Sequence, residues 1–119
     1  MNPFDFYSLA KSLNENLGNK NDPLYQATLR SCISRAYYSS YLSARDVSEL
    51  KPQGKKTHAD VIDYYSSDTK LHNDLKVLKA LRQKADYDIV ASVQFEEVEK
   101  ALFCCKKIFG FLEKYQKIS

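Results

Sequence analysis

The sequence predicts an all-α protein built as an antiparallel up-and-down bundle of four to five helices. Apolar residues recur with the 3.6-residue period of a helix along most of the chain, whereas the alternating pattern of a strand is almost absent. Glycine is rare, with three in 119 residues, and the polar segments between the periodic stretches are short. Because short loops connect antiparallel neighbours and this length supports one core, we expect a single helical domain over residues 1–119.

Two proline-containing segments mark the beginnings of the first two helices. Asn2-Pro3 is a typical helix start, and the apolar stripe from Phe6 to Leu17 follows it before Gly18 stops the helix. Asp22-Pro23 repeats the start signal for a second helix, which we expect to reach about Val47. The inner face of this second helix carries Tyr25, Leu29, Cys32, Ile33, Ala36, Tyr37, Ser40, Tyr41 and Ala44.

The second half of the chain predicts three further helices. After the polar, basic segment 48–56, Thr57 and Asp60 resemble a capping box for a short helix that turns His58 inward. A fourth helix follows the break SSDT, and the stretch DYDIVAS at 86–92 is typical of a connector. The stripes of the fourth and last helices consist of Leu71, Leu75, Leu78, Arg82 and Ala85, and of Val98, Ala101, Leu102, Cys105, Phe109 and Leu112.

Composition and motifs exclude several classes of function. The net charge of +3 is too small to predict nucleic-acid binding by itself, and no apolar stretch is long enough to cross a bilayer. The N-terminus has no basic region ahead of an apolar block, so we expect no signal peptide and a cytoplasmic protein. The chain contains no HxxxH, HExxH, GxGxxG or GK[ST] motif, and we therefore expect neither a metal site nor a cofactor.

The three cysteines are Cys32, Cys104 and Cys105. Their number is odd and no CxxC pair is present, which argues against a disulfide framework and against a zinc site. We expect reduced thiols. A redox-active pair formed by the adjacent Cys104 and Cys105 is the alternative.

Arg82 is the most informative single residue, because it falls within the apolar stripe of the fourth helix. A guanidinium stays charged, so its burial is costly unless partners satisfy it, and Asp86 one turn later is the natural partner. One interpretation is a structural ion pair, or an arginine whose head reaches solvent past a short core. The other is a cation at the wall of a cleft or subunit seam, where it meets phosphate.

Three further residues allow a structural and a functional interpretation. Arg35 and Tyr38 project away from Ile33 and give the second helix another face of aromatic and cationic character. That face is either packed by neighbouring helices or forms a dimer interface or ligand surface. His58 is either a hydrogen-bonded core or capping residue or a catalytic base, while His72 has no evident companion.

Three segments carry a resemblance to a known family. They are SRAYYSSYLSAR (34–45), KKTHADVIDYY (55–65) and LRQKADYDI (81–89), and a last amphipathic helix follows them. Together they resemble the HEPN superfamily, and more narrowly its small stand-alone members with R-A-Y-Y, K-T-H and L-R-x-x-A-D-Y-D blocks. The resemblance covers nearly the whole chain. It implies a HEPN-like bundle that forms a homodimer with a cleft at the dimer axis, in a toxin–antitoxin or defence setting and often with a nucleotidyltransferase partner.

Many proteins of that family are metal-independent ribonucleases with an arginine, four to six further residues and then a histidine. Arg82 matches the arginine, which the resemblance implies to hold the scissile phosphate. The positions of the histidine are occupied by Tyr87, Asp88 and Ile89, so this part of the motif is missing. His58 of the K-T-H block is a hypothetical replacement, provided that it reaches the same cleft as Arg82.

We therefore expect a protein that binds RNA or a nucleotide phosphate in a dimeric cleft. The expected contacts are Arg35, Tyr38, Asp86 and the loop lysines Lys55 and Lys56, around Arg82. One alternative is an active metal-independent ribonuclease that uses Arg82, Tyr87 and His58 as its catalytic residues. Another is a non-catalytic structural dimer or adaptor. The sequence leaves open whether a partner enzyme modifies Tyr87.

Overall fold

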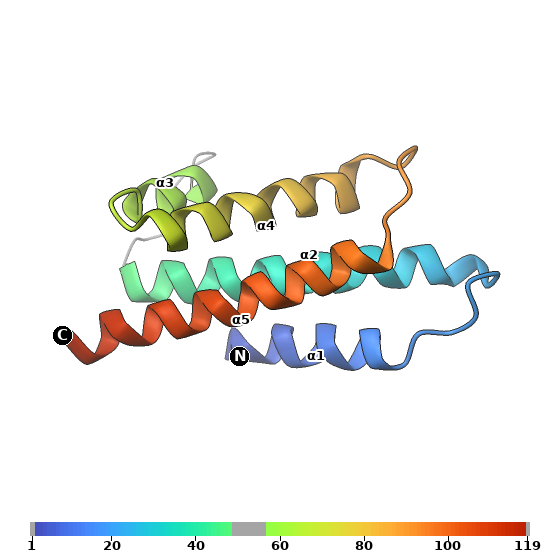
Figure 1. Cartoon of the computed structure of the whole chain (residues 1–119), viewed down its shortest axis with the longest axis horizontal. Coiled ribbons are helices and arrows are strands. Elements are labelled where there is room, and N and C mark those ends of the chain that lie inside the picture. The colour runs from blue at the N-terminus through green and yellow to red at the C-terminus, as the bar shows by residue number, and fades with distance from the viewer. Residues whose placement is uncertain (1, 49–56, 119) are drawn as a thin grey trace.

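The computed structural model describes residues 2–48 and 57–118 of the chain. Within these ranges it contains five helices and no strand, so the predicted all-α bundle is confirmed. The helices are α1 (Phe4–Glu15), α2 (Pro23–Ser48), α3 (Thr57–Tyr64), α4 (Thr69–Tyr87) and α5 (Phe95–Ile118). Figure 1 shows that α1, α2, α4 and α5 run up and down along the long axis, with the short α3 beside the beginning of α4.

The long helix α2 occupies the centre of the bundle and contacts each of the other four helices. Both α1 and α4 run antiparallel to α2, whereas α5 runs in the same direction as α2 (Figure 1). The resulting body is elongated, with extents of 48 × 27 × 26 Å. Its core is formed mainly by the fully buried side chains Leu29, Ile33, Tyr37, Val61, Tyr65, Leu71, Leu78, Val98, Cys105 and Ile108.

Aspartate side chains cap the beginnings of α2 and α4. The N–H of Leu24 donates to Oδ1 of Asp22 at 2.8 Å, and the N–H of Leu71 donates to Oδ1 of Asp68 at 3.3 Å. Each bond satisfies a backbone donor that has no partner within its own helix. The two helices consequently start where these aspartates stand, and the start of α2 at Pro23 agrees with the sequence prediction.

Two helix ends differ from the sequence prediction. Helix α1 ends at Glu15, because the N–H of Asn16 closes the last turn and Leu17 already lies outside the helix. Helix α4 is longer than predicted: Asp86 and Tyr87 belong to its last turn and not to the connector. The assignment of the whole stretch 86–92 as a connector was therefore wrong at its first two residues.

Arg30 of α2 provides the physical reason for the longer α4. Its Nη1 donates to the carbonyl oxygens of Lys84 and Ala85 at 3.1 and 2.8 Å, and its Nη2 donates to the carbonyl of Ala91. Carbonyl groups in the last turn of a helix lack partners within the helix. Arg30 supplies partners from a neighbouring helix, in addition to the N–H of Asp88 at the carbonyl of Lys84, and through Ala91 it ties the middle of the connector to α2.

Several sequence expectations fall outside the described residues. Lys55, Lys56 and the side chain of Thr57, which was expected to cap α3, belong to this group. The helices that the structure does describe include none with both the length and the apolar character needed to cross a membrane.

Candidate functional site

Side chains from α2, α3 and α4 meet in one aromatic and cationic group, which we call the Arg82 cluster. Its members are Tyr37, Tyr38 and Tyr41 of α2, His58 of α3, and Arg82, Asp86 and Tyr87 of α4. The three tyrosines of α2 follow the spacing i, i+1 and i+4, which places them on adjacent sides of that helix. Arg82 and Asp86 follow the spacing i, i+4 and therefore share one side of α4.

The guanidinium of Arg82 is held by two side chains of its own chain. Its Nε lies 2.9 Å from Oδ2 of Asp86, so the ion pair that the spacing suggested is present. Its Nη2 donates to the hydroxyl of Tyr38 at 3.0 Å. The side chain is only 15% exposed, compared with 26% for Asp86, and the pair is thus partly shielded from solvent.

Three tyrosine rings surround the same guanidinium. Its Cζ lies 5.4 Å from the ring centroid of Tyr37, 5.5 Å from that of Tyr38 and 4.9 Å from that of Tyr87. Burial alone would lower the pKa of Arg82, but Tyr38, Tyr87 and Asp86 outweigh burial and raise the pKa above its ordinary value. Arg82 is therefore a permanent cation in a fixed position, with aromatic faces on several sides.

His58 occupies the α3 side of the cluster. Its Nδ1 forms a hydrogen bond with the hydroxyl of Tyr37, and its ring stacks on Tyr41 with 4.0 Å between centroids and an interplanar angle of 6°. Burial lowers the pKa of His58 below 6.5, and the positive charges of Arg82, Lys79 and Arg45 lower it further. The imidazole is consequently neutral near pH 7, the form that accepts a proton.

Tyr37 connects His58 with Arg82. The hydroxyl of Tyr37 bonds to His58 while the face of its ring meets the guanidinium, and the residue is 2% exposed. Burial raises the pKa of Tyr37 above 10, although the charge of Arg82 acts in the opposite direction. Tyr37 therefore remains a neutral phenol that joins the two candidate functional groups.

The structure brings together five of the eight residues that the sequence singled out: Tyr38, His58, Arg82, Asp86 and Tyr87. Arg35 makes no described contact with this group, and its buried Nε has no hydrogen-bond partner among the residues that the structure describes. Lys55 and Lys56 are not described. Tyr37 and Tyr41 were assigned only to the core, and the signal that could have revealed their second role is the tyrosine-rich segment 37–41 itself.

The cysteine thiols differ from this cluster in their chemistry. All three are free and buried. Burial raises the pKa of Cys32 and of Cys105 to about 11, and burial followed by the charge of Asp74 raises the pKa of Cys104. A protonated, buried thiol is a poor nucleophile, so these residues act as small core side chains.

The cluster can bind an anion and can accept a proton. A fixed guanidinium binds phosphate or carboxylate, and a neutral imidazole is a general base. No group of three or more histidine, cysteine, aspartate or glutamate side chains suited to a metal ion occurs among the residues that were described. Comparison of the chain with protein-family models, with curated proteins and with solved structures gives no match.

Proposed function

We propose that this chain is a HEPN-type protein that binds the phosphate of RNA or of a nucleotide at the Arg82 cluster. The position of Arg82 is the observation that carries the proposal. Within the described part of the chain, Asp86 and Tyr38 use two of its N–H groups, whereas a guanidinium has five. The remaining donors are available to the oxygens of a phosphate, which arginine binds with a planar fork of parallel hydrogen bonds.

The neighbours of Arg82 favour a nucleotide over a simple anion. Tyr87 covers the guanidinium at 4.9 Å and is nevertheless 67% exposed, so one face of an aromatic ring stays accessible next to the cation. Nucleotide bases stack on exposed aromatic rings, and such stacking is a common mode of recognition for single-stranded RNA. A phosphate at Arg82 and a base on Tyr87 would satisfy both features with one ligand.

The proposal extends to the assembly that the HEPN resemblance implies. Two copies form a homodimer, the two Arg82 clusters face a shared cleft, and the protein acts with a nucleotidyltransferase in a toxin–antitoxin or defence module. The end of α4 supports the dimer, since Ile89 and Val90 beyond Tyr87 are 84% and 94% exposed and are the kind of apolar surface that proteins cover. Light scattering at micromolar concentration is expected to give a dimer, and a monomer would contradict this part.

Binding is tested with a fluorescein-labelled single-stranded RNA and with uridine monophosphate, by anisotropy and by calorimetry. Arg82→Met is expected to weaken both affinities about 10- to 100-fold, because hydrogen bonds to charged groups are worth about 1.5–3 kcal/mol. Arg82→Lys keeps the charge and loses the fork, so it should recover only part of the affinity. The control Lys106→Met removes one charge from the exposed surface of α5 and should bind as the wild type does. Equal affinities for wild type and Arg82→Met would refute the proposal.

A second candidate function is metal-independent cleavage of RNA at the same cluster. The observation that favours it is the link through Tyr37, which places the neutral His58 and the cationic Arg82 on one side chain. In such a reaction His58 takes the proton of the ribose 2′-hydroxyl, and the 2′-oxygen attacks the phosphorus while Arg82 stabilises the charge that develops on the phosphate. The P–O5′ bond breaks to give a 2′,3′-cyclic phosphate, and the leaving 5′-oxygen takes a proton from water.

Cleavage is tested by incubating pure protein with RNA in the presence of EDTA. His58→Ala and Arg82→Met are each expected to abolish product formation, while Lys106→Met retains it. Cleavage that survives Arg82→Met would identify a contaminating nuclease. Binding without cleavage in the wild type would leave the binding function and exclude the enzymatic one.

A further inference from the structure

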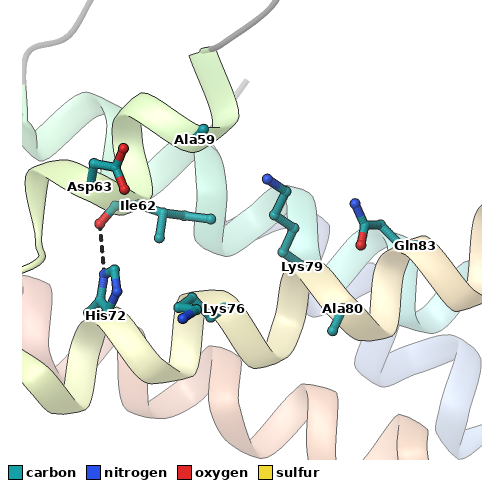
Figure 2. A pocket seen from close by; sticks show the side chains of 8 residues that line it. All are labelled: Ala59, Ile62, Asp63, His72, Lys76, Lys79, Ala80 and Gln83. Carbon is teal, nitrogen blue, oxygen red and sulfur yellow. Dashed lines mark hydrogen bonds between the residues drawn. The ribbon is translucent and has the colours of Figure 1, made fainter.

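A groove runs between α3 and α4 next to the Arg82 cluster. It has a volume of about 350 Å³, and Figure 2 shows α3 on one side and α4 on the other. The α4 wall contributes His72, Lys76, Lys79, Ala80 and Gln83, and the α3 wall contributes Ala59, Ile62 and Asp63.

The polar side chains of the α4 wall continue toward Arg82. His72, Lys76, Lys79, Gln83 and Tyr87 are separated by four, three, four and four residues, which places them along one face of the helix. Gln83 lines both the groove and a shallow hollow beside Tyr87, so the two depressions adjoin. At 1.5 Å per residue this face is about 22 Å long, which is more than one nucleotide requires.

The charges in the groove are suited to an anionic chain. Lys76 is exposed and Lys79 half-buried, and neither forms an ion pair with a carboxylate in the described part of the chain. The acidic lining residue Asp63 lies at the His72 end of the groove, whereas Lys79 and Gln83 lie at the other end (Figure 2). The charge of Lys79 also reaches the Arg82 cluster, because it lowers the pKa of His58 after burial and Arg82.

His72 has a structural partner in the wall, contrary to the expectation from the sequence. Its Nδ1 donates to the carbonyl oxygen of Ile62 at 3.0 Å, which joins α4 to α3 at one end of the groove (Figure 2). This bond helps to set the distance between α3 and α4. The groove therefore depends on the packing of the two helices and not only on the rotamers of its surface side chains.

We infer that the α3–α4 groove is a second phosphate subsite and that the ligand is a single-stranded RNA rather than a mononucleotide. The inference rests on the proposed function: one phosphate binds Arg82, the base beside it stacks on Tyr87, and the following phosphates lie against Lys79 and Lys76. An acidic peptide would also be attracted by the lysines. The exposed Tyr87 ring at the end of the same helix face favours a ligand that carries aromatic bases.

The test compares Lys76→Ala/Lys79→Ala with wild type, using a labelled uridine RNA of about 12 nucleotides, a length typical of single-strand binding sites. For single strands, each lost phosphate contact reduces the slope of log K against log salt by about 0.7. The double variant should therefore lose about 1.4 from the slope and bind about 25-fold more weakly at 0.1 M salt. Uridine monophosphate reaches only the Arg82 subsite, on which Lys79 acts through its charge alone, so its affinity should fall much less than that of the RNA.

The matched control is Lys11→Ala/Lys106→Ala. It removes the same charge from exposed positions of α1 and α5, which line a different depression. Helix α1 lies on the side of α2 away from α3 and α4 (Figure 1). The control should leave the slope and the affinity of the wild type unchanged. Melting temperatures of both double variants should stay close to that of the wild type, since Lys11, Lys76 and Lys106 are exposed and Lys79 is only half-buried.

The outcomes separate this inference from the proposed function. One outcome is a slope of log K against log salt for the RNA that depends on Arg82 and yet is the same in wild type and Lys76→Ala/Lys79→Ala. This result would overturn the groove as a phosphate subsite and leave the Arg82 site. Absence of binding to both RNA and uridine monophosphate would overturn both. Equal losses of RNA affinity in the groove variant and in the control would show a general effect of charge and overturn the groove as a phosphate subsite. Competition by polyglutamate as effective as competition by unlabelled RNA would overturn the choice of nucleic acid.

Discussion

The imidazole of His58 lies flat on the ring of Tyr41, with 4.0 Å between centroids and 6° between planes. This stacking buries the imidazole among cations that reach it from two helices, Arg45 of α2 and Lys79 and Arg82 of α4. A neutral imidazole is compatible with such surroundings, whereas an imidazolium is repelled by all three charges. The packing of α3 on the bundle is therefore coupled to the protonation state of His58.

The first prediction concerns the pH dependence of stability. Burial and the neighbouring cations lower the pKa of His58 in the folded state below its ordinary value of 6.5. Between the folded pKa and 6.5 the unfolded chain binds more protons, so the free energy of unfolding falls as the pH drops through this window. Above pH 6.5 both states are neutral at His58 and the effect vanishes.

Urea denaturation between pH 5 and 8 measures this dependence, with His58→Gln as the comparison. The difference in unfolding free energy between wild type and His58→Gln should shift in favour of the variant as the pH falls below 6.5. A difference that stays constant across the range would show that the folded state does not resist protonation of His58.

The second prediction concerns the Arg82–Asp86 pair. Arg82→Met removes the cation and leaves the carboxylate, which is 26% exposed, with only the hydroxyl of Ser34 as partner, so a loss of about 1–2 kcal/mol in stability is expected. Replacing both residues, as Arg82→Met/Asp86→Leu, removes the unpaired charge and should recover most of that loss. The two single variants and the double variant form a thermodynamic cycle in urea. Strictly additive losses would mean that the two side chains do not stabilise one another.

The third prediction compares two arginines of the same helix. Arg30→Met removes the side chain that binds the carbonyls of Lys84 and Ala85, so stability should fall by about 2–3 kcal/mol. Arg35→Met removes a guanidinium whose Nε has no partner among the described residues and should change stability by less than about 0.5 kcal/mol. Hydrogen exchange of the amides in 86–91 should accelerate only in Arg30→Met. Equal effects of the two substitutions would contradict the assigned role of Arg30.

Local interactions explain why the fold and part of the site could be predicted from the sequence. Helical periodicity assigns a face to each residue, and Leu71, Leu75 and Leu78 are buried as that periodicity requires. The ion pair between Arg82 and Asp86 joins positions four residues apart on one helix, so its geometry follows from the helix alone.

Non-local contacts explain what the sequence did not reveal. Arg30 binds backbone carbonyls 54 and 55 residues away, and Tyr37 bonds to His58 21 residues away. Such pairs depend on the rotation and offset of α2 relative to α3 and α4, which periodicity does not determine. Tyr37 illustrates the difference: its place in the core followed from its spacing, but its link between His58 and Arg82 did not.

The last prediction concerns the three cysteines. Cys104 and Cys105 are adjacent, but both are buried with raised pKa values, that of Cys105 to about 11 compared with 9.0 for a free thiol. A rise of this size lowers the thiolate fraction at pH 8 about 100-fold, and burial slows the reaction further. In the native protein, Cys32 and Cys105 should therefore react with a disulfide reagent at least about 100-fold more slowly than in guanidinium. Cys104 should also react more slowly than in guanidinium, where all three thiols are modified at once.

The competing interpretation is a redox-active pair, and it makes the opposite prediction. Treatment of the native protein with diamide would then join Cys104 to Cys105, with the loss of two hydrogen masses, and Cys104→Ser would prevent the change. Buried thiols should instead leave the mass unchanged in the wild type and in Cys104→Ser alike. A rapid, Cys104-dependent loss of two thiols would contradict the assignment of these residues to the core.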